Sequence, residues 1–424
     1  MPDLSFPEGF LWGAATAAHQ VEGNNTDSDW WEWERRPGTP CRDQSGSACE
    51  HYTRYPADIA LLASLGLNTY RFSVEWARIE PVEGTFDGAE LDHYRTMVDT
   101  VIEAGLTPMV TLNHFTLPQW LAGQGGWQAP KAPGLFARYC RRVVKELGDR
   151  IGWYCTVNEP WVVAFGGYLG ALGFPPGTHD FRAWERAISG LIDGHRMARA
   201  VVKELRPEAK VGATHSMQEW NAVSGGRPMM EYLRHMNEDV FLEACEADDF
   251  IGVQAYTRVR VSLPTVVGPV LRLALRAGPL VRAAAPRIIG RAATRPDAGV
   301  PPGARTTQMG YEYRPEAVGA TIERVVALHP GKEIVVTEHG VATEDDRERV
   351  EFIDRGLASI HALIVKGVPV RGYIHWSALD NFEWVRGYEP KFGLIGVDRI
   401  TQQRAVKPSA RHLGLVARTG RLTT

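Results

Sequence analysis

The chain is predicted to fold as a single (β/α)8 barrel, an α/β architecture in which eight parallel strands alternate with helices. Short β-rich runs alternate with longer amphipathic stretches along the 424 residues. Such alternation predicts parallel strands joined by helices, and eight repeats of it predict a closed barrel. The predicted strands span residues 10–16, 68–72, 108–113, 153–157, 211–214, 250–256, 334–337 and 372–376.

Amphipathic patterns fill the intervals between these runs. The clearest of them predict helices over residues 55–65, 89–104, 135–147, 184–205 and 350–365. A doubly wound open sheet is the alternative arrangement, and it would place a glycine-rich phosphate turn after the first strand. The run GAAT that ends the first strand lacks the GxGxxG spacing, which favours the barrel as one domain over residues 1–424.

Composition excludes several classes of function. The net charge is −3, so no overall field recruits nucleic acid, and charged residues make up an ordinary 23% of the chain. Neither an apolar run long enough for a membrane span nor a secretory signal in MPDLSFPEGF is found. Five cysteines without a CxxC pair predict neither a disulfide framework nor a structural zinc site. The expected location is the cytoplasm.

Polar and aromatic side chains recur at or just after the ends of the predicted strands. In a (β/α)8 barrel, the C-terminal ends of the strands form the face that carries chemistry. Packing does not require carboxylates, amides, an imidazole and indoles at seven separate strand ends, so we interpret the set as one site. Its members are Gln20, Arg71, His114, Asn158, Glu159, Tyr256, Glu338, Trp376, Glu383 and Trp384.

Two glutamates of this set are suited to the cleavage of an acetal. That reaction needs a proton for the departing oxygen and a carboxylate at the anomeric centre. Arg71 would keep Glu338 ionised, and Tyr256 would orient it through a phenolic hydrogen bond. The charge of Glu338 would raise the pKa of Glu159 and keep it protonated as the acid. Taken singly, either glutamate would normally be interpreted as a surface or ion-paired residue, and Arg71 fits a structural ion pair and Tyr256 a core tyrosine as well as they fit a catalytic role.

The other members of the set fit the recognition of a sugar ring. Sugar pockets combine aromatic platforms with a few placed polar groups. The indoles of Trp376 and Trp384 fit the platforms. The candidate ligands of the hydroxyl groups are Gln20, His114, Asn158 and Glu383.

Motifs along nearly the whole chain resemble glycoside hydrolase family 1, the β-glucosidase and β-galactosidase family. They are FPEGFLWGAATAAHQVEG, RFSVEWARIEP, LNHFTLPQWL, WYCTVNEPW, DFIGVQAY, VVTEHG and HWSALDNFEWVRGYEPKFGL. The resemblance implies a (β/α)8 barrel and a retaining exo-β-glycosidase, most simply a β-glucosidase, that needs no metal or organic cofactor. It also implies Glu159 as general acid/base and Glu338 as nucleophile. Arg71 and Tyr256 would then serve Glu338, and the other six members would bind the glycone.

Some positions depart from the residues that are usual in this family, and we expect them to alter the inner wall of the pocket. His339 replaces an asparagine after the nucleophile, and it would add a positive charge if protonated or act as a neutral replacement otherwise. The other departures are Gln254 for asparagine, Ala255 for the first tyrosine, and Phe115-Thr116 for a Trp-Asp pair.

The segment 258–305 differs in composition from the rest of the chain. It carries nine arginines, no lysine and one acidic residue, Asp297, and aliphatic runs separate the arginines. Arginines four residues apart predict short basic amphipathic helices on the mouth side of the barrel. One interpretation is a loop whose apolar faces cover the barrel. The other is a lid that accepts a lipid-linked aglycone, such as a steryl glucoside or glycolipid, with transient contact to a membrane surface or lipid micelle.

Three functions are compatible with these residues. The first is a retaining exo-β-glycosidase whose partner is a small-molecule β-glycoside. The second is a transglycosidase that passes the glycosyl unit to a hydrophobic acceptor. The third is a catalytically silent sugar-binding barrel, which the presence of both Glu159 and Glu338 disfavours.

Overall fold

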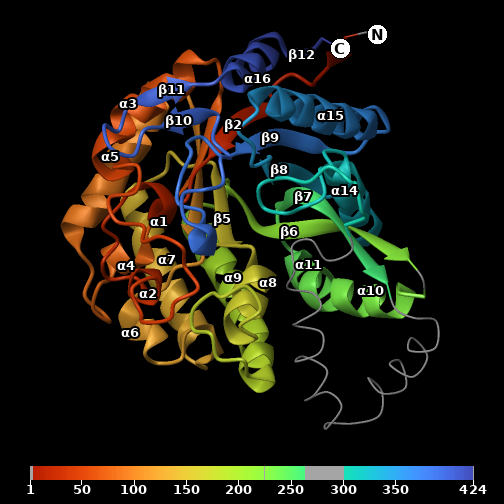
Figure 1. The fold of residues 1–424 in the computed structure, drawn as a ribbon. Coiled ribbons are helices and arrows are strands. Elements are labelled where there is room, and N and C mark those ends of the chain that lie inside the picture. The colour runs from red at the N-terminus through yellow and green to blue at the C-terminus, as the bar shows by residue number, and fades with distance from the viewer. Residues whose placement is uncertain (1–2, 224, 263–299, 424) are drawn as a thin grey trace.

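Eight parallel strands close into a barrel at the centre of the computed structural model, which describes residues 3–223, 225–262 and 300–423 (Figure 1). Each strand pairs with its neighbours in the sequence, and the last pairs in parallel with the first. The predicted (β/α)8 barrel is therefore confirmed. Its strands are β2 (Leu11–Ala15), β3 (Thr69–Ser73), β4 (Thr107–Asn113), β5 (Trp153–Asn158), β6 (Lys210–Val223), β7 (Phe250–Ser262), β8 (Glu333–His339) and β9 (Val370–Trp376).

Long helices surround the barrel and cover the outer face of its strands (Figure 1). All five predicted helices are present, and most begin a few residues earlier than predicted. In two of them the earlier start follows an aspartate, Asp180 or Asp345, that caps the first turn. The long helices are α3 (His51–Ser64), α5 (Gly88–Glu103), α7 (Ala132–Leu147), α9 (Phe181–Leu205), α14 (Ala317–Leu328), α15 (Asp346–Val365) and α16 (Pro408–Thr419).

Shorter elements lie in the loops between strands and helices. They include α1 (Ala18–Val21), α2 (Asp29–Trp33), α4 (Trp76–Ile79), α6 (Gln119–Ala122), α8 (Pro160–Val163), α10 (Arg227–Arg234) and α11 (Val240–Leu242). Two antiparallel pairs lie outside the barrel, β1 (Leu4–Ser5) with β12 (Arg421–Leu422) and β10 (Ile395–Val397) with β11 (Arg404–Val406). Over the ranges that the structure describes, no helix has the length and apolar character that crossing a membrane would require.

Two of the barrel strands, β6 and β7, are longer than predicted. They end at Val223 and Ser262 instead of residues 214 and 256. Beyond the barrel they continue as a parallel pair that projects beside α10 (Figure 1). Tyr256 therefore lies within its strand, and the prediction that it ends the strand is wrong. The short basic helices predicted for the segment after Ser262 fall in residues 263–299, which lie outside the described residues.

Candidate active site

The carboxylate of Glu338 lies inside the barrel and is held by side chains from two other strands. Arg71 of β3 donates from Nη1 to Oε1 at 2.6 Å, and Tyr256 of β7 donates from Oη to Oε2 at 2.5 Å. Burial raises the pKa of Glu338 above its usual value, and Arg71 and then Tyr256 limit this rise. The structure thus brings together the three residues that the sequence grouped, and the two donors favour the ionised form of Glu338.

The direction of Glu338 depends on an irregularity in β8. Val336 packs outward against the helical layer, and Val335 packs inside the barrel. Regular alternation would turn residue 338 outward. The pairing with β9 instead shifts register between Val336 and His339. Irregularities of this kind re-aim side chains next to active sites, and this one turns Glu338 into the barrel.

The same irregularity turns His339 away from the site, so the expectation that it alters the inner wall is wrong. Its Nδ1 lies 3.0 Å from Tyr373 Oη, its Nε2 lies 3.0 Å from the carbonyl oxygen of Pro315, and its ring stacks on Phe352 of α15. Burial lowers the pKa of His339 to about 4. His339 is therefore a neutral packing residue at physiological pH and adds no charge beside Glu338.

Glu159 follows β5 with a backbone conformation that is uncommon for a residue with a side chain. Its φ of 45° and ψ of 60° are left-handed, and Pro160 directly after it begins α8. The N–H of Glu159 donates to the carbonyl oxygen of Thr214 at 2.8 Å, which holds the turn. Residues held in this region cluster at functional sites, so the local backbone supports a role for the Glu159 carboxyl.

The two buried glutamates have opposite electrostatic environments. Burial and then the charge of Glu338 raise the pKa of Glu159 well above its usual value, against smaller effects of Ser216 and Arg71. Glu338, in contrast, has the guanidinium and the phenol in direct contact. Glu159 is therefore the carboxyl that keeps a proton, and Glu338 the one that loses it. This division suits an acid and a nucleophile on one glycosidic bond.

Asn158 of β5 connects this pair to the rest of the site. Its Oδ1 accepts from Arg71 Nη2 at 2.6 Å, from Thr214 Oγ1 at 2.8 Å and from Gln254 Nε2 at 2.9 Å. Its Nδ2 lies 3.2 Å from His114 Nε2. Because Oδ1 already has three donors, Asn158 can offer a sugar only its remaining N–H. Gln254, although it departs from the usual asparagine, joins the same network.

Unpartnered polar atoms gather around Gln20, His114 and Glu383. Gln20 Nε2 donates to the carbonyl oxygen of Phe382 at 2.8 Å and faces Glu383 Oε2 at 3.4 Å. Gln20 Oε1 and His114 Nδ1 are buried and find no hydrogen-bond partner among the described residues. Burial and then the charge of Glu338 raise the pKa of Glu383 to about 8. Buried polar groups normally have partners, so these atoms are suited to the hydroxyl groups of a ligand.

The two predicted platform residues form an aromatic wall with His114. The His114 ring lies 5.8 Å from Trp376 and 6.2 Å from Trp384, and both pairs are stacked. Phe115, which stands where the family has tryptophan, packs 5.0 Å from Trp384. The wall therefore lies beside the unpartnered atoms, as the face of a sugar ring would need.

Thr116 stands where the family usually has aspartate, and it hydrogen-bonds a carboxylate from another element. Its hydroxyl lies 2.9 Å from both carboxylate oxygens of Glu75, at the start of α4. Burial raises the pKa of Glu75 to about 7. Glu75 thus supplies a carboxyl at the place where the usual aspartate is missing.

Tyr311 also borders the site, although no pattern in the sequence predicted it. Tyr311 packs against the same apolar cluster as Tyr256, a cluster that includes Trp376, and burial and then the charges of Glu383 and Glu159 raise the pKa of its phenol. No strand pattern precedes it, so its place was not visible in the sequence. Asn381 accepts a hydrogen bond from Gln20 Nε2 at 3.1 Å. It lies in the motif HWSALDNFEWVRGYEPKFGL, so it could have been predicted as a site residue from the sequence.

Known proteins share both the sequence and the fold of this chain. The model of glycosyl hydrolase family 1 matches residues 3–246 and 245–421. β-Glucosidase A of Thermotoga maritima is 32% identical over 95% of this chain and 96% of its own length. Thermostable β-glucosidase B of Thermobispora bispora is 35% identical over 96% and 89%.

A solved structure gives the same assignment. It is the β-glucosidase of Thermotoga maritima in complex with N-octyl-5-deoxy-6-oxa-N-(thio)carbamoylcalystegine. It superposes with a TM-score of 0.85 at 30% identity, covering 99% of this chain and 100% of that one. The chain therefore belongs to glycosyl hydrolase family 1 and is an O-glycoside hydrolase.

Proposed function

We propose that this enzyme is a retaining exo-β-glucosidase in which Glu338 is the nucleophile and Glu159 the general acid/base. The observation that carries the proposal is the unequal environment of the two buried carboxyls. Arg71 and Tyr256 bind Glu338, whereas burial and the charge of Glu338 raise the pKa of Glu159. The names of both curated relatives support glucose as the glycone.

In the first step, Glu338 attacks the anomeric carbon while Glu159 gives its proton to the glycosidic oxygen. The aglycone leaves, and the sugar is bound to Glu338 as an ester. This bond removes the charge of Glu338, so the pKa of Glu159 falls and its carboxylate can take a proton from water. The water attacks from the face that the aglycone left, and the two inversions retain the configuration.

The remaining site residues would position the sugar. Gln20 Oε1 and the carboxyl of Glu383 would bind hydroxyl groups of the glycone, together with the free N–H of Asn158. The aromatic wall of Trp376 and Trp384 would pack against the C–H face of the ring.

The sugar released first from an aryl β-glucoside is expected to be the β-anomer. Proton NMR during the first turnovers distinguishes it from the α-anomer before mutarotation mixes the two. A panel of aryl β-galactosides and β-fucosides serves as the control for the glycone. Release of the α-anomer, or no turnover of an activated aryl glucoside, would overturn the proposal. If an added alcohol yields more new glycoside than free sugar, the result would favour the transglycosidase instead.

We further propose that the aglycone side accepts an apolar group such as a sterol or acyl chain. The arm formed by the ends of β6 and β7 carries an apolar cluster with α10. Met229, Leu233 and Val261 are buried there, and partly buried hydrophobic side chains surround them, among them Trp220, Met230 and Val259. The arm continues the strands past their C-terminal ends, where the aglycone of a barrel enzyme lies. The N-octyl ligand of the Thermotoga maritima relative is consistent with such an aglycone side.

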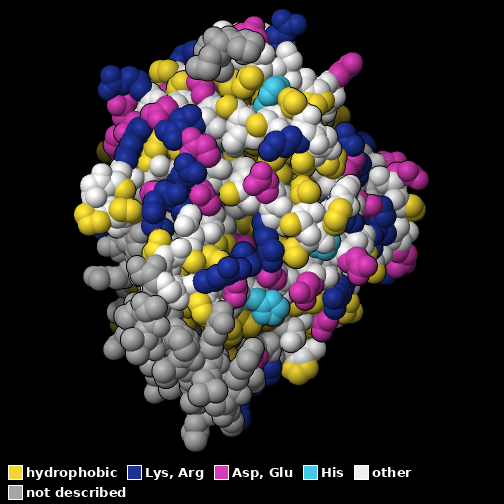
Figure 2. All heavy atoms as spheres, turned by 90° about the vertical axis from the view of Figure 1, so that its right-hand side faces the viewer, with side chains coloured by type: hydrophobic (Ala, Val, Ile, Leu, Met, Phe, Trp, Pro, Cys, Tyr) yellow, Lys and Arg dark blue, Asp and Glu magenta, His cyan; other side chains and the backbone are white. Residues whose placement is uncertain are grey.

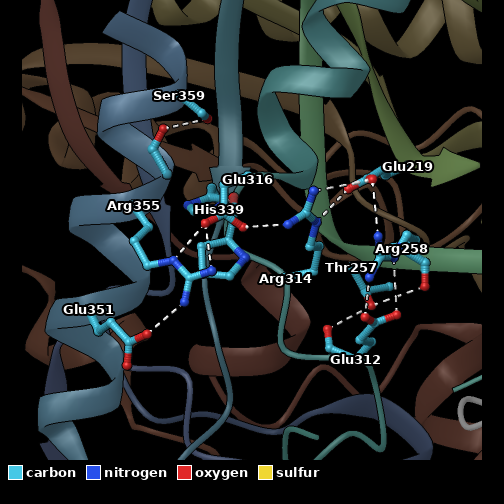
Figure 3. Close-up of polar contacts among 12 residues, drawn as sticks. Glu219, Thr257, Arg258, Glu312, Arg314, Glu316, His339, Glu351, Arg355 and Ser359 are labelled. Atoms are coloured by element: carbon cyan, nitrogen blue, oxygen red, sulfur yellow. Dashed lines mark hydrogen bonds and ion pairs between the residues drawn. The ribbon is translucent and has the colours of Figure 1, made fainter. Parts of the chain in front are cut away.

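The described arginines of the segment 258–305 do not support contact with an anionic membrane. Arg258 and Arg260 both pair with Glu312, and Arg305 pairs with Glu348 and Glu351. Figure 3 shows Arg258 and Glu312 within a wider network that includes Glu219, Arg314 and Arg355. On this face, basic and acidic side chains are mixed (Figure 2). The proposal is therefore restricted to an apolar aglycone in solution or in a micelle.

Deleting residues 271–289 is expected to lower the ratio of kcat/KM for a steryl glucoside to that for cellobiose by about tenfold, which is about 1.4 kcal/mol of discrimination between the two substrates. Met230→Glu, which places a charge in the apolar cluster of the arm, should lower the same ratio. Arg227→Glu, at an exposed position of the same helix, is the matched control. Turnover of an aryl glucoside shows that the site is intact. An unchanged ratio in both test variants would refute the apolar aglycone side.

A further inference from the structure

A second cluster of buried ionisable side chains lies away from the catalytic pair. His195 of α9, Cys245 at the end of a short 3-10 helix (Glu243–Cys245) and Asp248 just before β7 each present one ligand atom. These three atoms lie within 4.8 Å of one another, and all three residues are buried. None of them contacts Glu159 or Glu338 in the network described above, so the cluster needs its own explanation.

The spacing of the three atoms fits a single tetrahedral metal ion. His195 Nε2 lies 3.2 Å from Asp248 Oδ1, and Cys245 Sγ lies 3.9 Å from His195 Nε2. A zinc ion with bonds of about 2.0–2.3 Å separates its ligand atoms by roughly 3.3–3.7 Å. The two separations that involve His195 Nε2 therefore lie within a few tenths of an ångström of one coordination sphere, and the third is at most 4.8 Å.

Outer contacts aim the ligand atoms at one another. His195 Nδ1 lies 2.7 Å from Thr156 Oγ1 of β5, which leaves Nε2 directed into the cluster. Asp248 Oδ2 accepts the N–H of Ala213 at 3.1 Å, whereas the buried Oδ1 makes no hydrogen bond among the described residues and has only ion-pair contacts, with His195 Nε2 and Arg199 Nε. Ligands of protein metal sites typically have such outer partners on the atom that does not bind the metal.

We propose that His195, Cys245 and Asp248 bind a divalent transition-metal ion, and that zinc is the ion that fits this nitrogen, sulfur and oxygen set. Binding releases the proton of the Cys245 thiol, and the thiolate and the Asp248 carboxylate then balance the two charges of the ion. His215 Nε2, which lies 3.3 Å from Cys245 Sγ, is a candidate for a fourth position.

The alternative is a metal-free ion pair among the same side chains. Arg199 Nε lies 3.4 Å from Asp248 Oδ1, and a protonated His195 would also pair with this carboxylate. The two arrangements differ in the state of the sulfur, which is a thiolate only when it binds the metal. A bound ion would connect α9 to the 3-10 helix that ends at Cys245 and to the start of β7, so its role would be to stabilise the barrel.

Protein refolded with excess zinc and then desalted is expected to retain an equimolar amount of zinc by elemental analysis. Protein refolded with cobalt(II) instead should show the near-ultraviolet charge-transfer band of a thiolate–cobalt bond. A strong chelator, added during refolding, should lower the midpoint of thermal unfolding. Retention of no metal and absence of the thiolate band would overturn the proposal.

Two serine variants make the test specific to this cluster. Cys245→Ser is expected to lose the thiolate band and the zinc, whereas Cys140→Ser, which changes an equally buried cysteine of α7, should keep both. Zinc or the band retained by Cys245→Ser would contradict the assignment. If Cys245→Ser does not fold, the zinc content and cobalt spectrum of the unmodified protein decide. These readouts do not depend on glycosidase activity, so they test the metal site separately from the proposed function.

Discussion

Replacing Glu338 by glycine is expected to lower kcat for an aryl β-glucoside on the order of 10⁶-fold, the loss seen when a covalent nucleophile is removed. The glycine leaves an opening beside Arg71 and Tyr256, which donate to the carboxylate of Glu338. Added azide should enter this opening and attack the anomeric carbon in one inversion. The product is then the α-glycosyl azide, which NMR identifies.

A control substitution tests whether the loss of kcat in Glu338→Gly is specific to Glu338. It removes another buried carboxylate that pairs with arginine. Glu312 is also buried and pairs with Arg258 and Arg260 on the arm (Figure 3). Glu312→Gly should therefore keep kcat for the aryl glucoside within a few-fold of the original value. Full activity in Glu338→Gly, or the β-glycosyl azide as its product, would show that another group is the nucleophile.

The positions of the barrel strands could be predicted because their apolar runs are short and separated by long amphipathic stretches. Helix starts were less accurate, since they depend on caps that precede the apolar pattern. Asp180 accepts the N–H of Arg182, and Asp345 accepts that of Arg347. Capping adds a polar first turn that apolar periodicity does not reveal.

The arm of β6 and β7 could not be predicted from either strand alone. Past residue 217, β6 is mostly polar or half-exposed, and its extended conformation depends on pairing with β7. Glu219 lies opposite Arg258 in this register and pairs with it at 3.6 Å. A cross-strand ion pair of this kind becomes visible only when both segments are placed together.

Within the site, the residue types were predictable but the direction of each side chain was not. Arg71, Tyr256 and Glu338 come from three strands, and a barrel brings strand ends together wherever the chain places them. The directions of residues 338 and 339 depend on the irregularity in β8, because alternation alone would turn 338 outward and 339 inward, the reverse of what the structure has. For the same reason, the cluster of His195, Cys245 and Asp248 has no spacing motif and appears only after folding.

Glu159→Ala is expected to lower kcat/KM for an alkyl β-glucoside about 10²–10⁴-fold, the usual contribution of a general acid. A dinitrophenyl glucoside should lose far less in its first step, because its leaving group departs without a proton. Since the pKa of Glu159 is raised, the original enzyme loses activity as pH rises through that pKa and the acid is deprotonated. The variant should lack this alkaline decline with the activated substrate, which a pH profile of kcat/KM measures.

Azide tests the same residue from the other face of the sugar. In Glu159→Ala the glycosyl–Glu338 ester still forms, and azide can replace the water that Glu159 would have activated. Two inversions then give the β-glycosyl azide, opposite to the α-product expected from Glu338→Gly. Glu238→Ala, at a buried carboxyl that hydrogen-bonds Trp220 of the arm, is the control and should give no azide product. The same anomer from both catalytic variants would mean that the two glutamates do not lie on opposite faces of the anomeric carbon.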